Sequence, residues 1–393
     1  MNDNDKLTQG EETNKKPKLY ELIMEDILKK IDQNDFSFEK PICTEKELVE
    51  KYGVSRITAK RAITDLTNKG VLYRKPGVGT FVSRNVLSSI SDNPPEDDSK
   101  MFAFILPFEI TKGGLLDTVQ VANSILTSAG CCMGIYITSG NTAKEKKVLN
   151  QLIQQNISGL IFYPMSDDVH LELLDSFVIR NKPVIIIDKN INCQYIHGVV
   201  SDNFNGARML TEHLVSLGHK NIAYLSRFGT SELSSIRDRF GGFIVELKKF
   251  GISVKQENII TDLAGVNEDI LLKGKKIPEL NNIVNRLYKS GVTAIEAEND
   301  EVAYAIYQAC QELEIRIPED LSLCGFDDSA WAGKFPQGLT TIGQDFAQIG
   351  QKAGEILLDN LKGKLSEAQK HTVPVKLFIR GTTAPPRDLT TTN

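Results

Sequence analysis

The sequence predicts an α/β chain with two parts, a small helical head closed by a β-hairpin and a large two-lobed body with parallel sheets. Short apolar runs without alternation recur from residue 100 onward, and helical stretches lie between most of them. This pattern is typical of buried parallel strands. About 285 residues follow it, which is large for one doubly wound sheet, so two lobes are expected. The charge also divides the chain: residues 17–84 carry 13 Lys and Arg against 10 Asp and Glu, whereas the whole chain has a net charge of −5.

Two further segments lie before the head and between the head and the body. Residues 1–16 are polar and are expected to form a disordered tail. Residues 85–99, "NVLSSISDNPPEDDS", are rich in Ser, Asp, Asn and Pro and read as a linker. The start has no apolar segment of a signal peptide, and no apolar run approaches the roughly 20 residues of a membrane span. A cytoplasmic protein without membrane contact follows, with its six cysteines expected as buried free thiols.

The head is expected to contain three helices and a hairpin. The first helix is "LYELIMEDILKKI", in which apolar residues recur at spacings of four. The second begins after Thr44, where "TEKE" forms a capping box, and Gly53 makes the turn that follows. Ser55 caps the third helix, "RITAKRAITDLTNKG", which Gly70 ends. "VLYRKPGVGTFVSR" then reads as two short strands around a Gly-rich turn.

This order of elements is the winged helix-turn-helix arrangement, whose third helix enters the major groove of DNA. Arginine is the best donor to guanine edges, whereas lysine and threonine suit phosphates or bases. A basic helix face can also be only a solvated surface. The turn, the cap, the wing and the local positive charge favour DNA binding. The residues expected to contact DNA are Lys46, Arg56, Thr58, Lys60, Arg61 and Gly79.

The segment "TEKELVEKYGVSRITAKRAITDLTNKGVLYRKPGVGTFV" resembles the winged-helix domain of the GntR family. The resemblance covers residues 17–84 and implies the same DNA contacts, apart from Arg61. The chain departs from the family pattern at three positions. Cys43 stands where proline is usual, and Lys46 and Lys60 stand where arginine is common. Because lysine lacks the planar guanidinium fork, phosphate contact is favoured over base readout at the two lysines.

In the body, three apolar runs end in a polar residue, namely Asp188, Asn299 and Asp327. In open α/β sheets, ligands bind beyond the carboxyl ends of the strands. Carboxylates that accept hydrogen bonds, an arginine that donates them and an aromatic face together suit a polyhydroxylated ligand. Arg239 in "SIRDRFGGF" and Phe346 supply the last two groups. Each acid can instead be a turn or helix cap, and Arg239 can instead pair with an acid.

The motif "CGFDDSAW" contains adjacent carboxylates, Asp327 and Asp328, and the only tryptophan, Trp331. Adjacent residues of a strand point to opposite faces, so these two acids cannot flank one scissile bond. The five histidines lack metal-ligand spacing, and the sequence has no GxSxG, Walker A or GxGxxG motif. We therefore expect no enzyme, no cofactor and no metal. Asp327 is assigned to the cleft, Asp328 to the turn, and Trp331 either to the ligand wall or to packing at the hinge.

The segments "VVSDNFNGARMLTEHLVSLGHKNIAYLS", "RDRFGGF", "AENDEVAYAI", "IPEDLSLCGFDDS" and "LTTIGQDFAQIGQKAGEILLDNL" resemble the core of the LacI/GalR regulators. That core is a periplasmic-binding-protein type I fold, and the resemblance runs from residue 100 to 385. It implies an effector between two lobes joined by three crossovers. The implied effector contacts are Asp188, Arg239, Asn299, Asp327 and Phe346, with first-lobe contacts near residues 107–113.

A GntR-type head on a LacI-like body resembles regulators of the arabinose-repressor type. We therefore expect a homodimeric repressor of carbohydrate-use genes that binds double-stranded operator DNA and a small sugar, with a pentose favoured. Three alternatives remain: the same regulator sensing a purine or other metabolite, a sugar-binding protein of a transporter, and a hydrolase with a regulatory head. The linker lacks a hinge-helix pattern, so a change in the spacing of the two heads is the expected form of coupling.

Overall fold

The computed structural model divides the chain into two compact units, Met1–Asp98 and Ser99–Asn393, which are described here separately. We call them the head and the body. The structure describes residues 19–32, 40–68, 71–75, 78–83, 100–110, 114–167, 169–191, 193–229, 233–263, 277–362 and 367–388. The predicted tail, residues 1–16, and the predicted linker, residues 85–99, lie outside them, as do Gly70 and Gly77 at the predicted helix end and wing tip.

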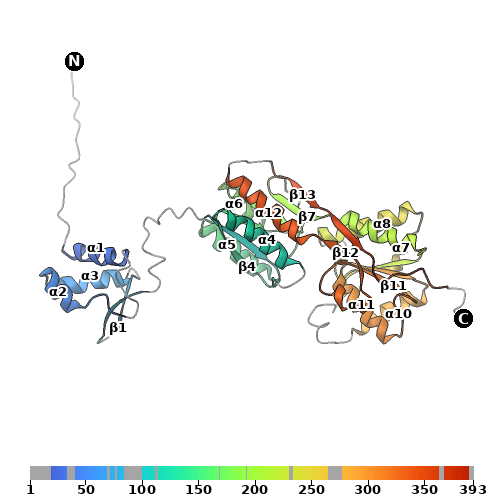
Figure 1. Cartoon of the computed structure of the whole chain (residues 1–393), viewed down its shortest axis with the longest axis horizontal. Coiled ribbons are helices and arrows are strands. Elements are labelled where there is room, and N and C mark those ends of the chain that lie inside the picture. Colours follow the sequence, from blue (N-terminus) through green and yellow to red (C-terminus); the bar gives the residue numbers. More distant parts are fainter. Residues whose placement is uncertain are drawn as a thin grey trace, which may run out of the picture. The chain divides into compact units, whose positions relative to one another are not determined.

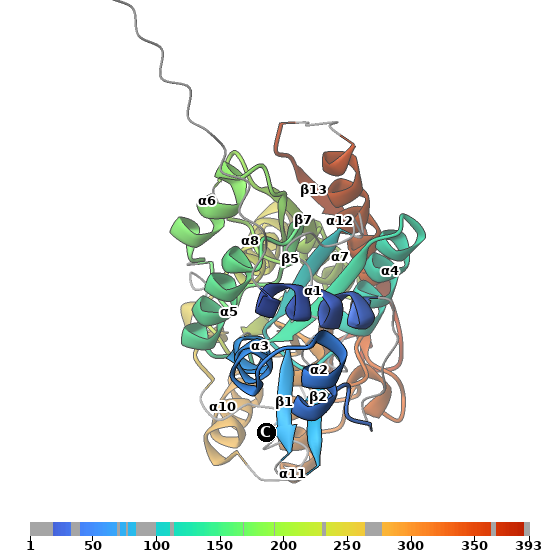
Figure 2. The same ribbon diagram turned by 90° about the vertical axis from the view of Figure 1, so that its left-hand side faces the viewer.

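The head contains the three helices and the hairpin that the sequence predicts (Figure 2). Thr44 caps the second helix and exchanges hydrogen bonds with Glu47, forming the predicted capping box, and Gly53 takes a φ of 62° at the turn. Ile23, Ile63 and Leu66 are completely buried in the core between the helices. The elements are α1 (Leu19–Asp32), α2 (Glu45–Tyr52), α3 (Arg56–Asn68), β1 (Leu72–Lys75) and β2 (Gly79–Val82), with β1 and β2 antiparallel.

The body consists of two lobes, each built on a six-stranded sheet with helices on both faces (Figure 1). In lobe 1 the strand order is β13-β7-β6-β5-β3-β4, and every pair is parallel. Apolar clusters cover both faces of this sheet, which explains the unbroken apolar runs. Its elements are β3 (Met101–Leu106), α4 (Leu115–Ser128), β4 (Cys132–Ile137), α5 (Thr142–Gln154), β5 (Gly159–Phe162), α6 (Leu171–Ile179), β6 (Val184–Ile187), β7 (His197–Ser201), α12 (Phe346–Leu361) and β13 (Lys370–Val373).

Lobe 2 has the strand order β14-β12-β11-β10-β8-β9, in which only the pair β12 and β14 is antiparallel among the described strands. Helices α7 and α8 pack against each other on one face, over an aromatic cluster that includes Tyr224 and Phe243. The elements are α7 (Asn203–Ser216), β8 (Ile222–Leu225), α8 (Ser234–Lys249), β9 (Ile259–Ile260), α10 (Pro278–Lys289), β10 (Ala294–Ala297), α11 (Asp300–Glu312), β11 (Ser322–Asp327), β12 (Thr340–Gln344) and β14 (Val375–Phe378).

The chain passes between the lobes at three places, because β7, α12 and β13 belong to lobe 1 while α7, β12 and β14 belong to lobe 2. The three crossovers therefore follow Ser201, Gln344 and Val373. This arrangement matches the two lobes with three connections that the LacI/GalR resemblance implies. The ends of β7 and β12 thus lie at the junction of the lobes, where a ligand between the lobes would lie.

The structure also bears on the expected membrane segments and cysteines. No helix among the described residues is long and apolar enough to cross a membrane. All six cysteines are free thiols; Cys43, Cys131, Cys310 and Cys324 are buried as expected, whereas Cys132 is exposed on the edge strand β4 and Cys193 is half-buried.

Candidate functional site

The first two turns of α3 present two cations to solvent. Ser55 caps the helix: its Oγ accepts a hydrogen bond from the Thr58 backbone N–H at 3.2 Å and lies 2.9 Å from Thr58 Oγ1. Arg56 and Lys60 are exposed, and neither has an acidic partner among the described residues. The cap therefore fixes the start of the helix and forms one hydrogen bond with the Thr58 hydroxyl. Arg56 and Lys60 remain available to an anionic ligand.

The other predicted DNA contacts have local partners. The Arg61 guanidinium lies over the Tyr20 ring at 4.3 Å and 3.9 Å from Asp65, so it leans toward α1. Lys46 lies 3.9 Å from Glu50 and is highly exposed, so this contact costs little to break. Gly79 begins β2 with a φ of 145°, and a Cβ built there would lie 2.7 Å from the Cβ of Pro41. Glycine is thus required at this position for a backbone reason, independent of DNA.

In lobe 1, the predicted strand-end residue Asp188 lies beside a buried cation. Asp188 follows β6 with a φ of 67°, and its carboxylate accepts a hydrogen bond from Lys189 Nζ at 2.6 Å. The Lys189 side chain is almost completely buried and lies over the Tyr163 ring at 5.5 Å. Burial by itself raises the pKa of Asp188, but Lys189 and Arg239 outweigh it and lower the pKa. Asp188 is therefore an ionised acceptor.

Arg239 on α8 is held by three hydrogen bonds within lobe 2. It is 5% exposed, and its Nε donates to Asn203 Oδ1 at 2.8 Å. One terminal nitrogen donates to the backbone oxygen of Glu298 at 2.7 Å, and the other to Asp327 Oδ1 at 3.1 Å. The guanidinium also stacks on the Phe326 ring at 3.8 Å. These contacts fix the guanidinium in one orientation and place a positive charge beside Asp327.

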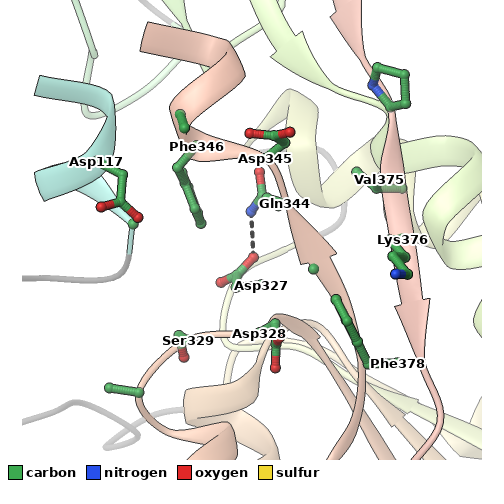
Figure 3. Close-up of a pocket in the computed structure, with 15 residues that line it drawn as sticks. Asp117, Asp327, Asp328, Ser329, Gln344, Asp345, Phe346, Val375, Lys376 and Phe378 are labelled. Carbon is green, nitrogen blue, oxygen red and sulfur yellow. Dashed lines mark hydrogen bonds between the residues drawn. The ribbon is translucent and has the colours of Figure 1, made fainter. Parts of the chain in front are cut away.

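Asp327 ends β11 and connects this arginine to the crossover after β12. Its Oδ1 also accepts a hydrogen bond from Gln344 Nε2 at 2.6 Å, as Figure 3 shows. The amide oxygen of Gln344 in turn accepts from Ser201 Oγ at the end of β7. Burial raises the pKa of Asp327, and Arg239 and Gln344 partly offset this rise. Asp327 has a φ of 109°, a strained backbone conformation that is common at functional sites.

The cavity beside Asp327 has a volume of about 540 Å³, which is sufficient for a small ligand. The Phe346 ring at the start of α12 forms part of its wall (Figure 3). This ring lies against Gly114, where a built Cβ would come within 1.8 Å of it, so the glycine makes room for the aromatic side chain. The cavity is lined by Gly114, Asp117, Asp327, Asp328, Ser329, Ala330, Gly343, Gln344, Asp345, Phe346, Ala347, Pro374, Val375, Lys376 and Phe378.

The structure separates the two carboxylates of "CGFDDSAW". Asp328 forms an ion pair with Arg380, with two contacts of 2.6 and 3.0 Å, and does not share the partners of Asp327. Trp331 packs on the core of lobe 2, where its ring lies 5.2 Å from Tyr304. Of the two alternatives left open for Trp331, packing is the one for which the structure gives contacts.

Asn299 is used as a helix cap. Its Oδ1 accepts from the Val302 backbone N–H at 2.9 Å, so this part of the amide serves α11. It follows Glu298, whose backbone oxygen anchors Arg239, and it is therefore near the cleft. The structure thus brings Arg239, Asp327 and Gln344 into one hydrogen-bonded group, whereas Asp188 is paired with Lys189. Of the five predicted effector contacts, Asp327 and Phe346 line the cavity.

Ser234, at the start of α8, makes direct contacts between the two lobes. Ser234 Oγ donates to Asp167 at 2.8 Å and accepts from the Asn190 backbone N–H at 2.8 Å. Sequence reasoning missed Tyr163, Lys189, Ser234 and Gln344. Gln344 could have been found from the rule for polar residues at strand ends, because it is the last residue of β12. Tyr163 directly follows β5, Lys189 follows Asp188, and Ser234 begins α8; none of the three has a distinct pattern in the sequence.

Comparisons with known proteins agree with this architecture. Residues 19–82 match the family described as bacterial regulatory proteins, gntR family, and residues 211–383 match the periplasmic binding protein-like domain. The arabinose metabolism transcriptional repressor of Halalkalibacterium halodurans is 27% identical over 374 residues, covering 93% of this chain and 96% of that protein. The repressor of the same name from Geobacillus stearothermophilus is 27% identical, covering 87% and 91%.

Among solved structures, a LacI family transcriptional regulator from Enterococcus faecium with bound ribose is similar. Its TM-score is 0.60 at 23% identity, covering 73% of this chain and 99% of that one. A complex of the transcriptional regulator CelR with cellobiose has a TM-score of 0.61 at 17% identity, covering 86% and 99%. These likenesses show that the body has the fold of LacI-type regulators. The two family matches and the full-length similarity to transcriptional repressors indicate a regulatory protein rather than an enzyme, in which a segment that matches the gntR family is joined to a segment that matches the periplasmic binding protein-like domain.

Proposed function

We propose that the protein is a cytoplasmic, dimeric repressor of carbohydrate-use genes that binds a two-fold-symmetric operator and responds to a neutral sugar bound between its lobes. One observation carries the proposal: exposed cations on a capped α3 occur in the same chain as a cavity beside Asp327, which both Arg239 and Gln344 hold by hydrogen bonds. The first feature suits DNA, and the second suits a ligand with several hydroxyl groups.

The charge balance of the cleft favours an uncharged ligand. Lys189 is paired with Asp188 at 2.6 Å, and Arg239 is paired with Asp327 at 3.1 Å. A phosphate or carboxylate ligand would have to displace an acid from one of these buried cations, which would cost more than binding to an unpaired cation. Hydroxyl groups can instead add to the existing pairs, because carboxylate oxygens accept several hydrogen bonds. The paired cations therefore favour a neutral sugar over a sugar phosphate.

A pentose is the favoured ligand, because two long alignments are to arabinose metabolism repressors and one similar structure contains ribose. A purine is the second candidate: the purine repressor PurR of Photobacterium profundum is 25% identical over 86% of this chain, and Phe346 offers an aromatic face. The DNA contacts that we propose are Lys46, Arg56, Thr58, Lys60, Arg61 and Gly79. For the effector we propose Asp188, Arg239, Asn299, Asp327 and Phe346, together with Gln344.

The experiment combines a ligand screen with operator titration. Arabinose, ribose, xylose, ribose 5-phosphate and hypoxanthine are tested by thermal shift, since a ligand at 100-fold its Kd stabilises by about 2.7 kcal/mol. Each stabilising ligand is then added to a gel-shift titration of operator DNA. We expect a neutral pentose to stabilise the protein and change its operator affinity. Stabilisation by ribose 5-phosphate alone, or no effect of any ligand on operator binding, would contradict the proposal.

A matched pair of variants tests the site. Asp327→Asn keeps the shape of the side chain but replaces a charge-assisted acceptor, worth about 1.5–3 kcal/mol, so the ligand should bind about 10- to 150-fold more weakly. Asp320→Asn is the control, because Asp320 is also a lobe 2 carboxylate paired with an arginine, Arg316, at 2.8 Å. We expect the control to keep the response, and operator affinity without ligand to be unchanged in both variants.

A further inference from the structure

An exposed isoleucine lies on the face of α3 that carries the cations. Ile57 is 81% exposed, although it lies in the first turn of a helix whose other aliphatic side chains form the head core. The buried residues of α3 are Ala59, Ala62, Ile63 and Leu66. The hydrophobic core therefore does not require an isoleucine at position 57.

The spacing places Ile57 on one face with polar and basic residues. Lys60, Arg61 and Thr64 are also exposed and follow it by three, four and seven positions, so the four share a helix face. Arg61 leans toward Tyr20, and the Thr64 hydroxyl donates to the backbone oxygen of Lys60. Ile57 is thus the apolar residue of this face; it directly follows Arg56 and precedes Lys60 by three positions.

Isolated exposed apolar residues are common on protein surfaces, so exposure alone indicates nothing. Here the surrounding positive charge indicates which kind of molecule Ile57 contacts. Arg56 and Lys60 attract the phosphate backbone, and a helix held in the major groove brings its N-terminal side chains to the base edges. The apolar group that those edges display is the 5-methyl of thymine. We propose that Ile57 reads one thymine methyl in each operator half-site, which rests on the DNA-binding function proposed above.

Removal of the methyl group from the DNA tests this inference directly. The full-length protein first selects an operator from a random duplex library at about 0.15 M salt. Each thymine is then replaced singly by deoxyuridine, which keeps base pairing but lacks the 5-methyl group. Burial of one methyl group contributes about 0.8 kcal/mol, so the replacement at the contacted thymine should weaken wild-type binding about 4-fold.

The variant Ile57→Ala completes a double-mutant cycle. At the contacted thymine, replacement by uracil should weaken DNA binding by this variant less than about 2-fold. At all other thymines, the replacement should weaken binding as much as it does in the wild type. Ile179→Ala is the matched control, because Ile179 on the body is also 81% exposed, and it should keep the wild-type pattern. Both variants should fold, since an exposed helical site accepts alanine readily, and thermal melts check this.

The outcomes separate this inference from the proposed function. Selection of an operator by the wild type, with the same uracil penalties in wild type and Ile57→Ala, would overturn the role of Ile57 and leave the regulator intact. A uniform loss across all DNA sequences in Ile57→Ala would overturn it equally. Failure of the wild type to prefer any sequence would overturn both.

Discussion

The buried carboxyl group of Glu296 should make the stability of lobe 2 depend on pH. Glu296 lies on the central strand β10, is 2% exposed, and faces the apolar cluster beneath α7. Among the described residues its hydrogen-bond partner is Thr211, whose hydroxyl lies 2.8 Å from the carboxyl oxygen. Burial raises the pKa of Glu296 from 4.5 to about 8, and the Thr211 hydrogen bond offsets only part of this rise.

The sign follows from proton binding. Between pH 4.5 and 8 the folded protein keeps a proton on Glu296, whereas the unfolded chain releases it. The free energy of unfolding therefore falls as pH rises through this window, by up to about 5 kcal/mol. Glu296→Gln removes the titration and keeps the shape of the side chain, and its amide can donate to Thr211. We expect the free energy of unfolding of Glu296→Gln to be close to that of the wild type near pH 5 and higher by about 3–5 kcal/mol at pH 8.

Urea denaturation between pH 5 and 8.5 measures this effect. Trp331 is the only tryptophan of the chain and packs on the lobe 2 core, so its fluorescence reports on this lobe. Glu319→Gln is the control, because Glu319 is an exposed glutamate of the same lobe, and its profile should parallel the wild type. The reasoning is refuted if Glu296→Gln is no more stable than the wild type at pH 8, or if its gain does not vary with pH.

Two further predictions concern the head and lobe 1. Arg56→Ala should weaken binding to operator by about 1–3 kcal/mol and to random DNA by less, because a base contact is proposed; equal losses in a titration of both duplexes would contradict it. Gly350→Ala should destabilise lobe 1 by more than about 2 kcal/mol in urea, because its Cβ would lie 2.2 Å from the backbone oxygen of Thr118 on α4. Gly354→Ala, whose Cβ would meet only the Ile125 side chain at 3.2 Å, should cost less, and similar losses would argue against this packing account.

The sequence predicted the elements whose signals are local. The caps at Thr44 and Ser55, the turn at Gly53 and the three apolar runs that precede Asp188, Asn299 and Asp327 all correspond to observed elements. The strands β9, β12, β13 and β14 were not predicted. β9 has only two residues, β12 has the sequence "TTIGQ" and is not an apolar run, and the two strands of "KHTVPVKLF" are partly exposed. Their role depends on which sheet they join, which is a tertiary property.

The candidate cleft was partly predictable for the same reason. Polar residues at strand ends pointed to Asp188 and Asp327, and the same rule applied to "TTIGQ" would have added Gln344. Lys189 could not be found, because a lysine after a strand is usually solvated, and its burial against Tyr163 arises only from the meeting of strands β5 and β6. The ion pair of Asp328 with Arg380 likewise joins positions 52 residues apart.

The double use of Gln344 has a consequence for how such a protein can change its specificity. Its amide nitrogen donates to Asp327 and its amide oxygen accepts from Ser201, so one side chain links the effector contact that we propose to two of the three connections between the lobes. With Asp327 as a ligand contact, a substitution that changes ligand preference there also changes the hydrogen bonds at these connections. A new ligand preference at this position would then be expected to occur together with a change at Ser201 or in the adjoining crossover.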